Sequence, residues 1–296
     1  MTSTFGAAVN LILSNLTGAL PGALSILFFV LGIYMVFAGL WGLANNYGDR
    51  GGATPVKGAI TLVLGGAALT SLVALFDTGL STVFGTVGYY TGAQVAVGTP
   101  TNCLATSSGS GNGGQLDCIL HNVGINLIPV AVETLFVACM LVGYATVGAL
   151  IYKLAMSSRR PGVEPPRHWG LKLFGAVLLG NFPWLVNLLS ITMGYQPLTD
   201  NSGYHGVQGG AASSILSYAG PSSGKLAQLS GVITWGCVIV SGFGLFYTAQ
   251  GIFMLMSPDV HPNRGKAYAH IFFGVLMANI YETARFITNM MGMSVL

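Results

Sequence analysis

Apolar runs long enough to cross a membrane alternate along this chain with short polar turns and long polar connections. At about 1.5 Å per residue, roughly 20 apolar residues cross a hydrocarbon core of about 30 Å. The pattern therefore predicts an all-α integral membrane protein with six transmembrane helices. The predicted spans are residues 20–44, 58–82, 128–153, 171–192, 231–256 and 267–291.

Short turns join these spans in pairs, which predicts three glycine-rich hairpins as repeated units. The spacing of Gly32 and Gly39 recurs at Gly244 and Gly251, and the spacing of Lys57 and Gly65 recurs at Lys266 and Gly274. The closing runs 178–194 and 276–292 align without a gap and place Asn181 on Asn279. Repeats of this kind indicate one supersecondary unit used several times. Chance similarity among glycine-rich membrane helices is the alternative. The predicted hairpins are 20–85, 128–194 and 230–296, and the polar loops are 86–127 and 195–229.

Two finer features are expected within this plan. Residues 5–18 place apolar side chains largely on one side at helical spacing, so residues 1–19 are predicted to form an amphipathic helix lying in the membrane interface. Pro183 falls inside the fourth span and should kink it, or leave neighbours to satisfy the freed carbonyl.

Composition supports the membrane assignment and draws attention to glycine. Hydrophobic residues make up 52% of the chain and charged residues 6%, against about 25% charged residues in an ordinary soluble domain. The chain holds 43 glycines in 296 residues, and small residues let membrane helices approach closely. The predicted helix-packing positions are Gly32, Gly39, Gly65, Gly66, Gly244 and Gly251.

Basic residues gather in the three hairpin turns and their flanks. Nine of the eleven lie there: Arg50, Lys57, Lys153, Arg159, Arg160, Arg167, Lys172, Arg264 and Lys266. Under the positive-inside rule these turns face the cytoplasm. The expected location is a bacterial inner membrane, with a multi-pass chain whose long loops and termini are periplasmic.

The cysteines fit this orientation. Cys103 and Cys118 flank a Gly/Ser-rich run in a loop predicted to be periplasmic, and they are the natural pair for a disulfide in an oxidising compartment. Two free thiols are the alternative. Cys139 and Cys237 lie in apolar spans and are expected to be small packing residues.

The sequence offers no convincing catalytic, metal or cofactor motif, so we expect no enzyme activity and no cofactor. The G-x-G-x-x-G spelling at Gly109, Gly111 and Gly114 follows no predicted strand and opens no helix, so it is taken as accidental. Asp77, Glu133 and Glu282 lie toward the outer ends of their spans, which weakens a transport function. Glu282 and Arg285 are three residues apart and are expected to form an intramembrane ion pair.

The basic turns have two possible ligands, anionic lipid headgroups or a nucleic acid. Each cation near an anionic surface contributes on the order of 1 kcal/mol. Topology alone accounts for their charge, however. Membrane lipid is therefore an expected partner, and direct nucleic-acid binding is not expected.

The first hairpin carries a family resemblance. Its Leu20-Pro21, Val30-Leu31-Gly32-Ile33, Ala38-Gly39-Leu40, Pro55-Val56-Lys57-Gly58 and Leu64-Gly65-Gly66-Ala67 resemble the small inner-membrane proteins of type IVB (Dot/Icm) secretion systems. These are the IcmC/DotE and IcmD/DotP group, with TraQ and TraR as IncI-type conjugation counterparts. The hairpin with its short basic turn also looks like the membrane form of conjugative pilins. The resemblance covers roughly residues 15–90 well and the other hairpins loosely, and this chain departs from it in being longer.

The resemblance implies a non-enzymatic structural component of an inner-membrane secretion or conjugation apparatus. Such a subunit would pack with copies of itself or with partner subunits, as a homo- or hetero-oligomer around the translocation path. A small-solute transporter or channel built from three hairpins is the alternative hypothesis.

Overall fold

The structure is a computed structural model, and it describes residues 5–48, 56–84, 119–159, 168–200, 203–204, 225–257 and 264–290. Within these residues the chain is almost entirely helical, which confirms the predicted all-α character. The longer helices are α1 (Phe5–Gly48), α5 (Ile128–Arg159) and α9 (Lys225–Met256). The shorter helices are α2 (Val56–Thr70), α3 (Leu72–Phe84), α6 (Trp169–Gly180), α7 (Phe182–Thr192), α10 (Arg264–Ala278) and α11 (Ile280–Met290).

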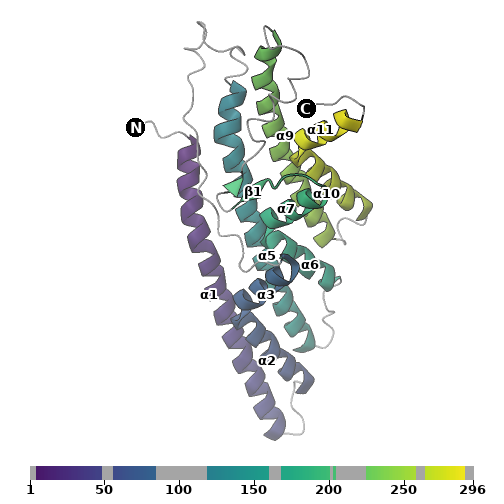
Figure 1. The fold of residues 1–296 in the computed structure, drawn as a ribbon. Coiled ribbons are helices and arrows are strands. Elements are labelled where there is room, and N and C mark those ends of the chain that lie inside the picture. The colour runs from purple at the N-terminus through teal and green to yellow at the C-terminus, as the bar shows by residue number, and fades with distance from the viewer. Residues whose placement is uncertain are drawn as a thin grey trace.

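Each long helix runs beside the short helix that follows its turn. α1 packs on α2, α5 on α6, and α9 on α10, and the C-terminal ends of α1, α5 and α9 point toward the same end of the molecule (Figure 1). Neighbouring pairs also touch, since α2 contacts α5 and α6 contacts α9. The pairs are displaced stepwise along the helix direction, so the C-terminal end of α9 lies higher in Figure 1 than those of α5 and α1.

Three described helices are long and apolar enough to cross a membrane, with spans Gly22–Ala44, Ile128–Ser157 and Trp235–Met256. The number becomes five if α2 with α3 and α6 with α7 each count as one span. Those two pairs are bent by 75° and 90°. The predicted six spans are therefore not confirmed. The second predicted span holds a break that its hydropathy does not reveal, whereas a kink was expected in the fourth span, at Pro183.

Helix α1 and the helical segment that leads into α5 are longer than the sequence predicts. A single helix covers Phe5–Gly48, so residue 19 is no helix boundary. The side chains of residues 1–18 lie outside the described residues, and the interfacial placement of this segment stays a prediction. Before α5, residues 119–122 are helical and Val123–Leu127 form the π-helical turn η2, within a stretch expected to be a loop. Its glycine, Gly124, packs on the indole of Trp235, and a π turn is one way to absorb an extra residue in a helix.

One short sheet follows α7. β1 (Thr199–Asp200) and β2 (Gly203–Tyr204) pair antiparallel with Thr199 opposite Tyr204.

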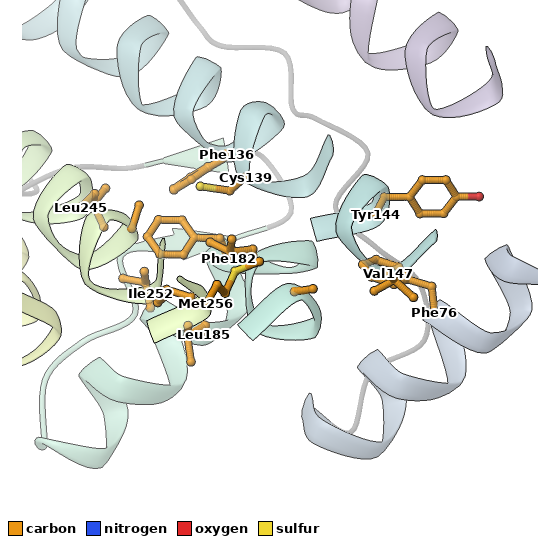
Figure 2. Packing of buried hydrophobic residues seen from close by; sticks show 14 of the residues in the cluster. Phe76, Phe136, Cys139, Tyr144, Val147, Phe182, Leu185, Leu245, Ile252 and Met256 are labelled. Atoms are coloured by element: carbon orange, nitrogen blue, oxygen red, sulfur yellow. The ribbon is translucent and has the colours of Figure 1, made fainter. Parts of the chain in front are cut away.

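The core lies on both sides of α5. Phe136 and Phe182 meet edge to face with ring centroids 5.8 Å apart, beside Leu245 and Met256 of α9 (Figure 2). On the other side, Tyr144 contacts the rings of Phe28 and Phe76. Helix α5 therefore joins the first pair of helices to the third.

Candidate functional site

The second helical run of each predicted hairpin is interrupted by a single residue. Ser71 separates α2 from α3, Asn181 separates α6 from α7, and Asn279 separates α10 from α11. In each case the carbonyl of the break residue accepts the backbone N–H four residues later, at 3.0 Å, 3.1 Å and 2.9 Å respectively. The break residue thus starts the next helix. Asn181 and Asn279 are the two residues that the sequence alignment superposes, and both are buried.

The break in the fourth predicted span falls at Asn181 and not at Pro183. Pro183 occupies the first turn of α7, where its missing N–H would have had no helical acceptor. Asn181 has φ −134° and ψ 57°, outside the helical region, so the helix direction changes there. The proline is therefore the start signal of a new helix and not a kink inside an old one.

A glycine of the first helix faces each break. A Cβ on Gly32 would lie 2.7 Å from the carbonyl oxygen of Gly66 and 2.8 Å from the amide nitrogen of Thr70. A Cβ on Gly143 would lie 2.5 Å from the Ala176 carbonyl oxygen and 2.8 Å from the Gly180 nitrogen.

The third pair has the same arrangement. A Cβ on Gly244 would lie 2.6 Å from the Gly274 carbonyl oxygen and would collide with the Ala278 nitrogen. In all three pairs the amide nitrogen nearest to the added Cβ belongs to the residue just before the break. Only glycine permits so close an approach of two helix backbones.

The second predicted glycine of the outer hairpins also lies between helices. A Cβ built on Gly39 would lie 2.8 Å from the Ala59 carbonyl oxygen, and a Cβ built on Gly251 would lie 2.8 Å from that of Ala267. The corresponding position of α5, seven residues after Gly143, is Leu150.

These contacts correct the sequence alignment of the first and third hairpins by one residue. Gly274 corresponds to Gly66, because each meets the glycine opposite the break. Gly65, which the sequence aligned with Gly274, faces the next hairpin: a Cβ built on it would lie 2.6 Å from Cβ of Ala155. Two adjacent glycines make the register ambiguous in the sequence, and only the helix faces separate them.

Buried polar side chains connect the second and third hairpins at the breaks. Asn279 donates from Nδ2 to Oγ of Ser190 at 2.8 Å and to the carbonyl of Val275 at 2.9 Å. Within the third hairpin, Ser241 of α9 donates to the carbonyl of Ala278 at 2.6 Å. Helix α7 therefore begins just after Asn181, the break of its own hairpin. Its last turn is bonded through Ser190 to Asn279, the break of the next hairpin.

Helix α3 makes the corresponding connection between the first two hairpins. Phe76 lies against Gly180, the residue before the second break, and Gly79 faces Val177. This connection is apolar, whereas the one made by α7 includes the Asn279–Ser190 hydrogen bond.

The membrane acids differ in burial. Glu133 of α5 is only 1% exposed, although it lies six residues into the span. Asp77 lies on α3 and is partly buried, and Glu282 lies in the first turn of α11 and is also partly buried. The side chain of Arg285 lies outside the described residues, so the predicted ion pair stays a prediction.

Five of the described basic residues lie at the turn ends of their helices. Lys57 is in the first turn of α2, Lys172 is in that of α6, and Arg264 and Lys266 begin α10. Arg159 is the last residue of α5. Arg50, Arg160, Arg167, Cys103 and Cys118 lie outside the described residues, so the disulfide also stays a prediction. Cys139 is buried and Cys237 is partly buried, and both are free thiols.

Comparison of the chain with protein-family models, curated proteins and solved structures found no match. Among the residues described, the structure contains no cluster of three potential metal ligands. Sequence reasoning missed Ser71, Ser190 and Ser241. The available signals for the breaks were the alignment of Asn181 with Asn279 and the kink expected at Pro183. The Asn279–Ser190 bond joins residues 89 positions apart.

Proposed function

We propose that this chain is a non-enzymatic structural subunit of an inner-membrane type IV secretion or conjugation apparatus, related to the IcmC/DotE and IcmD/DotP group. In this proposal it consists of three repeated glycine-packed hairpins whose basic turns face the cytoplasm and whose termini are periplasmic. It contacts lipid and other subunits, and it uses no cofactor.

The observation that carries the proposal is the recurring glycine contact. Gly32, Gly39 and Gly66, which belong to the family resemblance, lie at the closest approach of α1 and α2. In the other two pairs, Gly143 and Gly244 make the same contact, and the second helix breaks one residue after the amide nitrogen that they face. The three helix pairs therefore share the contact made by the glycines on which the resemblance rests, and this supports the proposal of one repeated unit.

The shared direction of the three long helices supports the proposed orientation. The C-terminal ends of α1, α5 and α9 lie toward one end of the molecule, and the described basic residues of α2, α6 and α10 lie in the first turns of those helices (Figure 1). A single cytoplasmic side for the three turns is the arrangement that the positive-inside rule favours.

The experiment that tests this function is deletion of the gene in its native host. Loss of conjugative transfer or protein secretion, with growth unchanged, is the expected result, and co-purification of other apparatus subunits with the tagged chain is the second readout. Complementation by wild type restores transfer, whereas Gly39→Leu does not, because its side chain would enter α2. Gly22→Leu is the matched control, since nothing lies within 4 Å of a Cβ at Gly22. Normal transfer and secretion in the deletion strain would reject the proposal.

A transporter or channel is the second candidate, and the helix breaks favour it. Gly32 lies ten residues after Gly22 and twelve before Ala44, so the break opposite it falls near the middle of that span. Gly143 and Gly244 lie similarly near the middle of theirs. Breaks near the membrane centre at matching repeat positions are typical of transporters, and irregular backbone at that depth must be buried in protein or line a water-filled cavity.

Solute flux separates the two candidates. The purified chain in liposomes should give no uptake or release of ions, sugars or amino acids above that of protein-free vesicles if it is structural. Flux that disappears on Asn279→Ala or Glu133→Gln would favour the transporter, because both side chains are buried near the breaks or within the membrane span.

A further inference from the structure

The three hairpins pack on one another through one repeated interface, whose two halves are left uncovered at the ends of the row. The leading face of a hairpin is defined here as four residues of its first helix at spacings of four, three and four. The leading faces are Ile33, Phe37, Leu40 and Ala44 on α1, Tyr144, Gly148, Ile151 and Ala155 on α5, and Leu245, Ala249, Ile252 and Met256 on α9. These positions correspond because they keep the same distance from Gly32, Gly143 and Gly244.

The trailing face is defined by three residues around the break of the second helix. The trailing faces are Gly65, Leu69 and Leu72 in the first hairpin, Gly175, Leu179 and Phe182 in the second, and Phe273, Met277 and Ile280 in the third.

Trailing and leading faces meet at the same position in both junctions within the chain. A Cβ built on Gly65 would lie 2.6 Å from Cβ of Ala155, and a Cβ built on Gly175 would collide with Met256. Ala155 and Met256 are corresponding residues, as are Gly65 and Gly175. The second hairpin therefore sits on the first as the third sits on the second, and the relation is head-to-tail.

The end faces are the exposed members of this series. On α5 and α9 the leading face is buried, apart from Ile151, which is partly buried. On α1 the corresponding Phe37 is 68% exposed and Leu40 is 49% exposed. Only 22% of the α1 span is buried, against 50% for the spans of α5 and α9.

The trailing face of the third hairpin is open at Phe273, and its Met277 and Ile280 are partly buried. Phe273 is 60% exposed, whereas Leu69, Leu72, Leu179 and Phe182, which lie on the first two trailing faces, are buried.

We infer that a second copy of this chain covers these faces, with Phe273 of one copy against Ala44 of the next. This deepens the proposed function and rests on its hairpin repeat, but not on the secretion role. The occupant is a second copy because the two open faces are the two halves of an interface that the chain already makes twice. Each internal contact pairs a glycine with Ala155 or Met256, and the new one pairs a large phenylalanine with a small alanine.

A repeated head-to-tail contact makes a ring if its rotation closes and an open row if it does not. Phe28 of α1 lies against Gly148 of α5, whereas the residue of α1 that corresponds to Gly148 is Phe37. Neighbouring hairpins are therefore displaced by nine residues, or about 14 Å along the helices. Equal membrane depth for all spans then requires tilted helices. With hairpins roughly 18 Å apart, or two helix spacings, the tilt is roughly 40°, at the upper end of the range for membrane helices.

Cysteine cross-linking in native membranes tests this contact. Two tagged forms, Ala44→Cys and Phe273→Cys, are expressed together and oxidised. The expected result is a mixed disulfide band at twice the 30.7 kDa mass of the chain, carrying both tags. Either variant expressed alone should give no such band, because a head-to-tail contact does not place a residue against itself. The wild-type chain reports the background from the four native cysteines.

Phe272→Cys with Ala44→Cys is the matched control, since Phe272 is also exposed but lies about 100° around α10 from Phe273. Single-molecule counting of the wild-type chain in nanodiscs is the second measurement and should find more than one copy.

Three outcomes would overturn the inference: monomers without a mixed band, which assigns the faces to lipid; a strong band from one variant alone, which indicates a two-fold contact; or cross-linking only to a different protein. Each of these outcomes is compatible with loss of transfer in the deletion strain, so the two proposals fail separately.

Discussion

Replacing Gly32 by alanine tests the glycine contacts with the smallest possible change. The added methyl would lie 2.7 Å from the carbonyl oxygen of Gly66 and 2.8 Å from the amide nitrogen and Cγ2 of Thr70. Comfortable contacts of a carbon atom begin at about 3.5 Å. The two nearest backbone atoms cannot rotate away, so α2 must move by roughly 0.5–1 Å along this part of the hairpin.

The cost follows from two opposing effects. Overpacking a well-packed contact costs about 1–3 kcal/mol, whereas alanine favours the helix over glycine by up to about 1 kcal/mol. The net expectation is a loss of about 1–2 kcal/mol in the free energy of unfolding. Gly22→Ala is the control in the same helix, where nothing lies within 4 Å of the new methyl. That variant should be neutral or slightly more stable than wild type.

The assay is the thermal midpoint of the purified protein in detergent, followed by size-exclusion chromatography of the remaining folded fraction. At about 2–4 °C per kcal/mol for a large domain, Gly32→Ala should melt about 2–8 °C below wild type. Gly244→Ala and Gly236→Ala form a second pair, because Gly244 faces Gly274 and Ala278 whereas Gly236 faces nothing within 4 Å. Equal midpoints for the variants of Gly32 and Gly22 would refute the reasoning that backbone approach at this position requires glycine.

Three further predictions concern the break, the topology and the loop. Asn279→Ala removes two buried hydrogen bonds, which at about 0.6 kcal/mol each and rarely above 1.7 should lower stability by about 1–2 kcal/mol in the same melting assay; an unchanged midpoint would show that the bond contributes nothing to stability. A cysteine at position 158 (Ser158→Cys) should resist a membrane-impermeant thiol reagent in intact cells while Ser213→Cys reacts, and the reverse labelling would invert the proposed orientation. Cys103 and Cys118 should appear as one disulfide-linked peptide pair by mass spectrometry without reductant, and two alkylated free thiols would contradict this.

The sequence alone predicted the features that depend on local chemistry. Long apolar runs indicate membrane helices because an exposed backbone polar group in lipid is costly, and the short turns that pair them follow from Gly, Pro and Asn content. The glycine positions were also readable: Gly32, Gly39, Gly66, Gly244 and Gly251 all lie where two helices of one hairpin meet. These glycines were also expected to contact other chains, and that stays a prediction. Within the described residues, the atoms that face them belong to the same hairpin.

Only the tertiary structure decided where helices break and which face each glycine presents. In a membrane helix the lipid-facing and protein-facing residues are both apolar, so periodicity does not mark the buried face as it does in a soluble helix. The sequence therefore could not separate Gly65, which meets Ala155 of the next hairpin, from Gly66, which meets Gly32. The interruptions at Ser71 and Asn279 leave no proline or glycine at the break, and the buried bond from Asn279 to Ser190 joins segments 89 residues apart, so only packing brings them together.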